Sequence, residues 1–170
     1  MTKKLSGTWC WAAFFVAGAT MAENARILII DDNVAEATLT KLTLQADRIG
    51  YSIEHVTDGY TGIDKLKQAA LTELPYHIVI VDVNMPVISG CETLEIIRNT
   101  DKISETYVVI LTSLQCKTDC PRDLYLCHAK RADIYLHKKT TLDDFEAELL
   151  QLKTDYEKCM KMTAANAKDI

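Results

Sequence analysis

The chain has 170 residues, 48% of them hydrophobic, and a formal net charge of −5. That length can bury one core of ordinary size, so we expect one domain. The acidic balance argues against nonspecific nucleic-acid binding, because such binding needs clustered basic residues that neutralise phosphates.

The N-terminal segment has features of a targeting sequence. Lys3 and Lys4 precede an apolar stretch over residues 9–19, and small residues follow it. This is the outline of a secretory signal peptide, and the stretch is too short to span a membrane. Met21 would also serve as the initiator methionine of a cytoplasmic protein, so we favour a mis-assigned start site over export. A membrane-associating anchor over residues 1–20 is a third alternative. We expect residues 1–24 to be an extension of a cytoplasmic protein without stable membrane insertion.

From residue 26 onward, strand patterns alternate with helical patterns. Apolar runs predict strands at residues 26–30, 51–56, 78–81, 107–111 and 134–137. Apolar residues at helical spacing predict helices at residues 34–49, 60–71, 91–98, 119–130 and 142–160. This alternation predicts a parallel sheet covered on both faces, with right-handed crossovers. The carboxyl ends of the strands then meet at one edge, where open α/β sheets bind ligands.

Charged and hydroxyl side chains follow four of the predicted strands. Asp31 and Asp32 follow the first, Asp82 the third, Thr112 the fourth and Lys138 the fifth. Three crowded carboxylates repel each other, and magnesium relieves this repulsion because it prefers oxygen ligands. An ammonium and a hydroxyl suit the oxygens of a phosphoryl group. The set therefore predicts aspartyl-phosphate chemistry with a carboxylate as the nucleophile.

The spacing of these residues matches the pattern of a known family. The pattern is an acidic pair, an Asp that ends the third strand, a Pro four and a Gly eight residues later, then a Thr and a Lys after the last two strands. In this chain these residues are Asp31-Asp32, Asp82, Pro86, Gly90, Thr112 and Lys138. Over residues 25–152 the chain resembles the receiver domain of the two-component response-regulator family, with single-domain chemotaxis regulators as the nearest type. The resemblance implies a doubly wound, flavodoxin-like α/β fold with five parallel strands in the order 2-1-3-4-5.

The resemblance also assigns roles within the site. It implies that Asp82 accepts phosphate from a histidine kinase or a histidine phosphotransfer protein. It implies that Asp32 binds Mg²⁺ directly and Asp31 through water, with Asp82 and the backbone carbonyl of Asn84 as further ligands.

Three further residues complete the set that the resemblance implies. Thr112 and Lys138 would contact the phosphoryl group, and Thr112 and Tyr135 correspond to the pair that reports phosphorylation. Residues 153–170 are expected to be a helix extension and tail, with no room for a DNA-binding module. We therefore expect a single-domain switch that signals to a downstream protein target and is not an enzyme. A homodimer through the last helix is one further expectation.

One departure from the family pattern leaves alternatives open. Lys139 stands where the family usually has a proline. This departure favours a rival interpretation, a pseudo-receiver that carries no phosphate and acts as an interaction module. A second rival is a phosphatase-like hydrolase with Asp82 as its nucleophile, but such an enzyme needs a second acid where Asn84 stands. The intact carboxylates and Lys138 favour the receiver.

Histidine and cysteine carry no assigned chemistry. The histidines lack convincing catalytic partners, so we interpret them as surface or strand-edge residues: His55, His77, His128 and His137. The six cysteines show no disulfide framework, and we expect most of them to be packing thiols.

Overall fold

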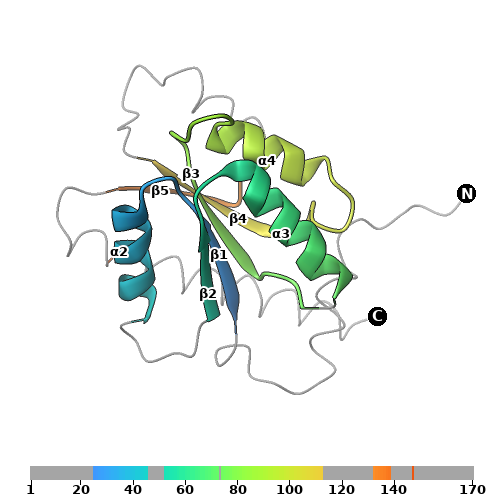
Figure 1. Ribbon diagram of the computed structural model, residues 1–170, viewed down its shortest axis with the longest axis horizontal. Coiled ribbons are helices and arrows are strands. Elements are labelled where there is room, and N and C mark those ends of the chain that lie inside the picture. The colour runs from blue at the N-terminus through green and yellow to red at the C-terminus, as the bar shows by residue number, and fades with distance from the viewer. Residues whose placement is uncertain (1–24, 46–51, 73, 113–131, 139–146, 148–170) are drawn as a thin grey trace, which may run out of the picture.

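Five parallel strands form one sheet in the order β2-β1-β3-β4-β5 (Figure 1). The computed structural model describes residues 25–45, 52–72, 74–112, 132–138 and 147. The strands are β1 (Arg26–Ile30), β2 (Ser52–Val56), β3 (Ile78–Asp82), β4 (Tyr107–Thr112) and β5 (Ile134–His137). The predicted doubly wound architecture and its strand order are therefore confirmed.

Helices cover both faces of this sheet. The described helices are α2 (Val34–Gln45), α3 (Gly59–Leu71) and α4 (Gly90–Arg98). Because successive side chains of a strand point to opposite faces, Ile27 and Ile29 pack with α2, whereas Leu28 and Ile30 pack with α3 and α4. Figure 1 shows this division, with α2 on one side of the strands and the other two helices together. The predicted helices at 119–130 and 142–160 lie outside the described residues.

Polar caps explain why α3 and α4 each begin one residue earlier than predicted. Asp58 accepts a hydrogen bond from the backbone N–H of Thr61 and caps α3. Ser89 and Glu92 form a reciprocal capping box at the start of α4. With the cap on Ser89, Gly90 becomes the first helical residue.

Gly90 lets α4 begin directly against the end of β3. A Cβ atom added at this position would lie 2.1 Å from the carbonyl oxygen of Asp82. The backbone N–H of Gly90 also donates to the carbonyl oxygen of Val83 at 2.9 Å. The position of Asp82 is thus set by a backbone contact that a side chain at residue 90 would block.

The connection from β3 to α4 contains a strained residue. Val87 has φ = 74°, a left-handed conformation that is unfavourable for a β-branched side chain. Its side chain is 84% exposed, so packing does not offset this cost. The turn that follows Asp82 therefore holds its shape against a local backbone preference.

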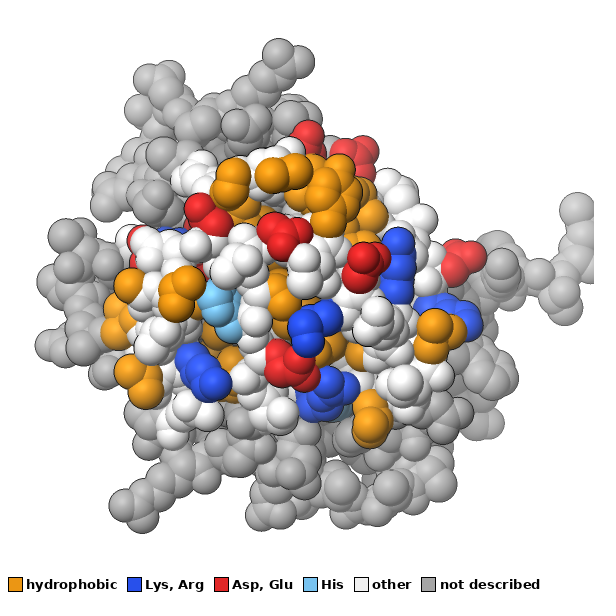
Figure 2. Space-filling model, viewed as in Figure 1, with side chains coloured by type: hydrophobic (Ala, Val, Ile, Leu, Met, Phe, Trp, Pro, Cys, Tyr) orange, Lys and Arg blue, Asp and Glu red, His pale blue; other side chains and the backbone are white. Residues whose placement is uncertain are grey.

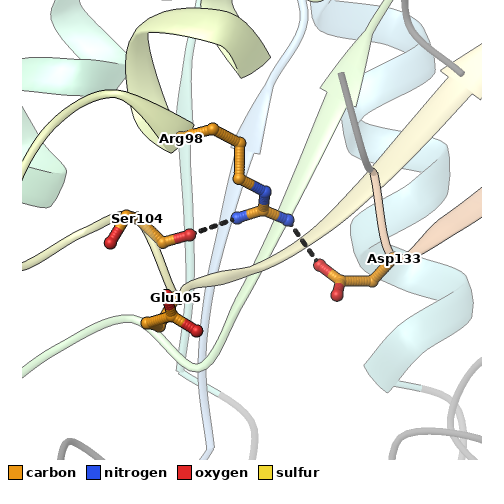
Figure 3. Close-up of a pocket in the computed structure, with 4 residues that line it drawn as sticks. All are labelled: Arg98, Ser104, Glu105 and Asp133. Atoms are coloured by element: carbon orange, nitrogen blue, oxygen red, sulfur yellow. Dashed lines mark hydrogen bonds and ion pairs between the residues drawn. The ribbon is translucent and has the colours of Figure 1, made fainter. Parts of the chain in front are cut away.

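At the opposite edge of the sheet, Arg98 ties the loop before β4 to β5. Its guanidinium donates to the carbonyl oxygen of Ser104 at 2.8 Å and to a carboxylate oxygen of Asp133 at 2.7 Å (Figure 3). The same Asp133 oxygen accepts from the backbone N–H of Val108 at 2.7 Å. Together with Glu105 these residues line a cavity. The ion pair and hydrogen bonds fix the starts of β4 and β5, far from the edge that carries the carboxylates.

Two expectations about individual residues are wrong. His77 is buried, with 6% of its surface exposed, and its Nδ1 accepts from the backbone N–H of Arg26 at 3.0 Å. Its ring replaces a strand partner for Arg26, which the sequence pattern does not show. Cys91 is disulfide-bonded, so it is not the unpaired packing thiol that was expected.

The face of the molecule shown in Figure 2 has mixed polarity. On the face shown in Figure 2, basic and acidic side chains are interspersed. Among the described residues, no helix has the length and apolar character needed to cross a membrane.

Candidate functional site

The strand register brings the predicted site residues to one edge of the sheet. Ile30 pairs with Val81, so Asp31 and Asp82 follow at the same level on neighbouring strands. On the other side of β3, β4 ends at Thr112, and Lys138 follows the end of β5. The polar residues that were expected to converge therefore lie on adjacent elements.

The three aspartates form a compact carboxylate cluster. One carboxylate oxygen from each of Asp31, Asp32 and Asp82 lies within 4.8 Å of the others. Asp31 and Asp82 are buried, with 1% and 5% of their surfaces exposed, while Asp32 is exposed. Two of the carboxylates therefore have little contact with water, and the third faces solvent.

Backbone N–H groups orient the two buried carboxylates. The N–H of Asn33 donates to Asp31 Oδ1 at 2.8 Å, and the N–H of Asn84 donates to Asp82 Oδ2 at 2.9 Å. In each case the donor is two residues after the aspartate, an Asx-type turn that the short side chain favours. These bonds hold one oxygen of each carboxylate and leave the other for the site.

Lys138 is the cation that joins the buried carboxylates. Its Nζ lies 2.7 Å from Asp82 Oδ1 and 3.2 Å from Asp31 Oδ2, and it also contacts Glu36 of α2. The backbone N–H of Lys138 donates to the carbonyl oxygen of Thr112 at 2.7 Å. This bond extends the pairing of β5 with β4 by one residue and fixes where the lysine side chain starts.

The cluster raises the pKa of two of its groups, for different reasons. Burial raises the pKa of Asp31, and the Asn33 hydrogen bond and the charge of Lys138 offset this only in part. Burial lowers the pKa of Lys138, but its hydrogen bonds to Asp82 and Glu36 outweigh burial and raise it overall. Lys138 is therefore an ammonium throughout the physiological range, beside the Asp31 carboxylate, whose burial is only partly compensated.

Thr112 and Tyr135 occupy the positions expected of them on β4 and β5. Thr112 is fully buried at the last position of β4. Tyr135 is half-buried and packs against the core under α3 and α4. Lys139, which stands where the family usually has a proline, lies outside the described residues.

Two residues near the cluster were missed at the level of sequence. Glu36 lies in the first turn of α2 and contacts Lys138. His55 at the end of β2 bonds through Nε2 to the carbonyl oxygen of Asp31 at 2.8 Å. In sequence Glu36 is an ordinary acidic residue in the first turn of a helix, and only its tertiary contact with Lys138 shows that it lies at the site.

Comparison with known proteins identifies the family. The sequence model of the response regulator receiver domain matches residues 27–150. The chain therefore belongs to the response-regulator receiver domain family of two-component signalling. Members of this family are signalling switches rather than metabolic enzymes, and they carry a divalent cation in an acidic pocket.

Individual relatives agree with this assignment. The chain is 33% identical over 132 residues to the transcriptional regulatory protein QseB of Haemophilus influenzae, covering 75% of this chain and 52% of QseB. Chemotaxis response regulator CheY4 of Vibrio cholerae is 28% identical with a TM-score of 0.59, covering 75% of this chain and 96% of CheY4. The Mn²⁺-bound form of response regulator Rcp1 shares the fold, with a TM-score of 0.64 at 22% identity over 76% of this chain and 92% of Rcp1. The chain spans about half the length of QseB.

Proposed function

We propose that the chain is a phosphorylation-dependent signalling switch in which Asp82 accepts a phosphoryl group. The observation that carries this proposal is the environment of the Asp82 carboxylate. It is buried at a strand end, oriented by the N–H of Asn84 and 2.7 Å from the ammonium of Lys138. A carboxylate with one fixed oxygen and an adjacent cation is suited to act as a nucleophile toward phosphorus.

The phosphodonor is proposed to be a phosphohistidine on a histidine kinase or a histidine phosphotransfer protein. A carboxylate oxygen of Asp82 forms the new P–O bond while the P–N bond to the partner's imidazole breaks, and the leaving imidazole takes up a proton. Lys138 offsets negative charge on the phosphoryl oxygens. This attraction is stronger in the buried site than it would be in water.

The donor set of the cluster fits a magnesium ion. Asp31, Asp32 and Asp82 supply carboxylate oxygens within 4.8 Å of one another, and oxygen atoms are the ligands that this hard cation prefers. The backbone carbonyl of Asn84 is the proposed fourth protein ligand. When bound there, the ion would offset the charge of the carboxylates and of the transferring group.

Thr112 and Tyr135 are proposed to convert phosphorylation into a change of surface. The Thr112 hydroxyl would move toward the phosphoryl group, and the Tyr135 ring, half-buried on the neighbouring strand, would turn inward behind it. This shifts an existing equilibrium between two conformations. The coupling between site and surface is then about 1–3 kcal/mol, as is typical of such switches.

The rest of the chain is assigned by the same proposal. Residues 25–152 would form the receiver, residues 1–24 an extension, and residues 153–170 a helix extension and tail. The switch would act in the cytoplasm, where its phosphodonor is, and would signal by contact with a downstream protein and not with nucleic acid. Self-association through the last helix is a further part of the proposal.

Incubation with acetyl phosphate and Mg²⁺, followed by intact mass measurement, tests the proposal. We expect a phosphoryl adduct on the wild-type protein and none on Asp82→Asn, which keeps the shape of the side chain. Equal labelling of both proteins would show that Asp82 is not the acceptor. A wild-type protein that takes up no phosphate would favour the pseudo-receiver, the alternative that Lys139 suggests.

A further inference from the structure

Glu36 contacts the site without belonging to its carboxylate cluster. It lies in the first turn of α2, and one of its oxygens contacts the ammonium of Lys138. Its other oxygen accepts from the side-chain amide of Asn33 at 2.9 Å. Asn33 therefore holds one carboxylate oxygen of Glu36, and the other oxygen contacts Lys138.

The three carboxylate partners of Lys138 match its hydrogen-bonding capacity. A lysine ammonium has three N–H donors, and the partners here are Asp82, Asp31 and Glu36. A phosphoryl group on Asp82 would bring new acceptor oxygens to the same ammonium. One existing partner must then give way.

We propose that Glu36 is a positioning residue that restrains Lys138 and competes with the phosphoryl group for its ammonium. This inference rests on the proposed function. Asp31 belongs to the cluster whose charge a bound cation would offset, and the acceptor oxygens of Asp82 are replaced by those of its phosphoryl group. Glu36 lies outside that cluster, so its charge is not compensated in the same way. It remains a full competitor after the other two partners have weakened.

Neutralising Glu36 should therefore strengthen the phosphorylated form. The Glu36 side chain is 45% exposed, and partly exposed ion pairs contribute little free energy, so we expect a modest change in affinity. Glu36→Gln keeps an acceptor for Asn33 and removes the charge. At saturating Mg²⁺, this variant should bind beryllofluoride, an aspartyl-phosphate mimic, about two- to fivefold more tightly than the wild type.

Two comparison variants separate the effect of the Glu36–Lys138 contact from the effect of removing a negative charge anywhere on the protein. Glu105→Gln removes the same charge from an exposed position at the opposite edge of the sheet, and it should leave beryllofluoride affinity unchanged. Glu36→Asp keeps the charge but shortens the reach to Lys138, so it should move affinity in the same direction as Glu36→Gln. If Glu36→Gln does not fold, the beryllofluoride affinity of Glu36→Asp still tests the inference.

A double-mutant cycle with Lys138→Ala tests whether the effect runs through the lysine. In the Lys138→Ala background, Glu36→Gln should change beryllofluoride affinity no more than Glu105→Gln does. Because binding is expected to be weaker in this background, the titration covers a wider range of beryllofluoride concentration. Two results would overturn the inference. An equal effect of Glu36→Gln in both backgrounds would mean that Glu36 only repels the anion. A weaker beryllofluoride affinity in Glu36→Gln than in the wild type would mean that Glu36 assists Lys138.

The same measurements separate a failure of this inference from a failure of the proposed function. If wild-type protein neither binds beryllofluoride nor accepts phosphate, the proposed function itself fails. If wild type does bind and Glu36→Gln matches it, only the role of Glu36 fails. Calorimetric Mg²⁺ titrations of each variant ensure that saturation is reached.

Discussion

Substitution of Gly90 by alanine should damage both the fold and the site, because the added methyl group meets backbone. Its Cβ would lie 2.1 Å from the carbonyl oxygen of Asp82 and 3.0 Å from Cα of Val83. Neither atom can rotate away, so either α4 or the end of β3 must shift by nearly an ångström. The shift moves the acceptor carboxylate with its backbone.

The size of the effect follows from these contacts. Overpacking typically costs about 1–3 kcal/mol, and we place this variant at the upper end, about 3 kcal/mol, because the added methyl group meets backbone. Any stretching of the 2.9 Å bond from Gly90 N–H to the Val83 carbonyl adds up to about 1 kcal/mol. For a chain of this length, about 3 kcal/mol lowers the melting temperature by about 6–12 °C. Thermal unfolding measures this loss, and calorimetry should show weaker Mg²⁺ binding in the same variant.

Gly62→Ala is a matched control with a different kind of neighbour. There the added Cβ would lie 2.3 Å from Cδ1 of Ile30, the end of a side chain that can change rotamer. The gain of about 0.5–1 kcal/mol from replacing glycine within a helix offsets part of the overpacking. We expect a loss of at most about 2 kcal/mol and unchanged Mg²⁺ affinity. If Gly62→Ala destabilises as much as Gly90→Ala, the argument from backbone proximity is wrong.

Three further predictions concern the strained turn, a buried histidine and the cation site. Val87→Asn should raise the free energy of unfolding by about 1 kcal/mol, because asparagine tolerates a left-handed backbone, whereas Val87→Ile should leave it unchanged. Equal melting temperatures for Val87→Asn and the wild type would contradict this. Burial lowers the pKa of His77, so its contribution to stability is complete above pH 6.5 and is lost as the pH falls through its folded-state pKa. Urea unfolding from pH 7.5 to 5 should show this decline, and His77→Gln should remove it; a decline of the same slope in the variant would assign it to other groups. Mg²⁺ binding measured by calorimetry should weaken more in Asp32→Ala than in Asp31→Ala, and wild-type affinity in both variants would place the site elsewhere.

The fold and the acceptor edge could be predicted because strand ends and side-chain chemistry coincide in the sequence. Each apolar strand pattern ends within one residue of the observed strand, and the residues that follow lie together because parallel strands end at the same edge. Asp31, Asp82 and Lys138 were grouped on this basis, and the structure places Lys138 Nζ within 3.2 Å of both carboxylates.

Residues whose roles depend on tertiary contacts were missed. Glu36 reads as an ordinary first-turn acidic residue of a helix, and only the approach of β5 brings Lys138 to it. His77 reads as a polar residue before a strand, and its burial follows from the ring bonding to the N–H of Arg26 on a neighbouring strand. α4 begins one residue earlier than predicted, because the side chain of Ser89 caps the helix and Gly90 becomes its first residue.

Chemical trapping of the phosphorylated residue tests the central claim most directly. An aspartyl phosphate is reduced by borohydride to homoserine, which tandem mass spectrometry can locate within a peptide. After phosphorylation by acetyl phosphate with Mg²⁺, we predict homoserine at position 82 alone, with less of it in Lys138→Ala. Homoserine at Asp31, Asp32 or any other carboxylate in place of Asp82 would contradict the assignment of the acceptor.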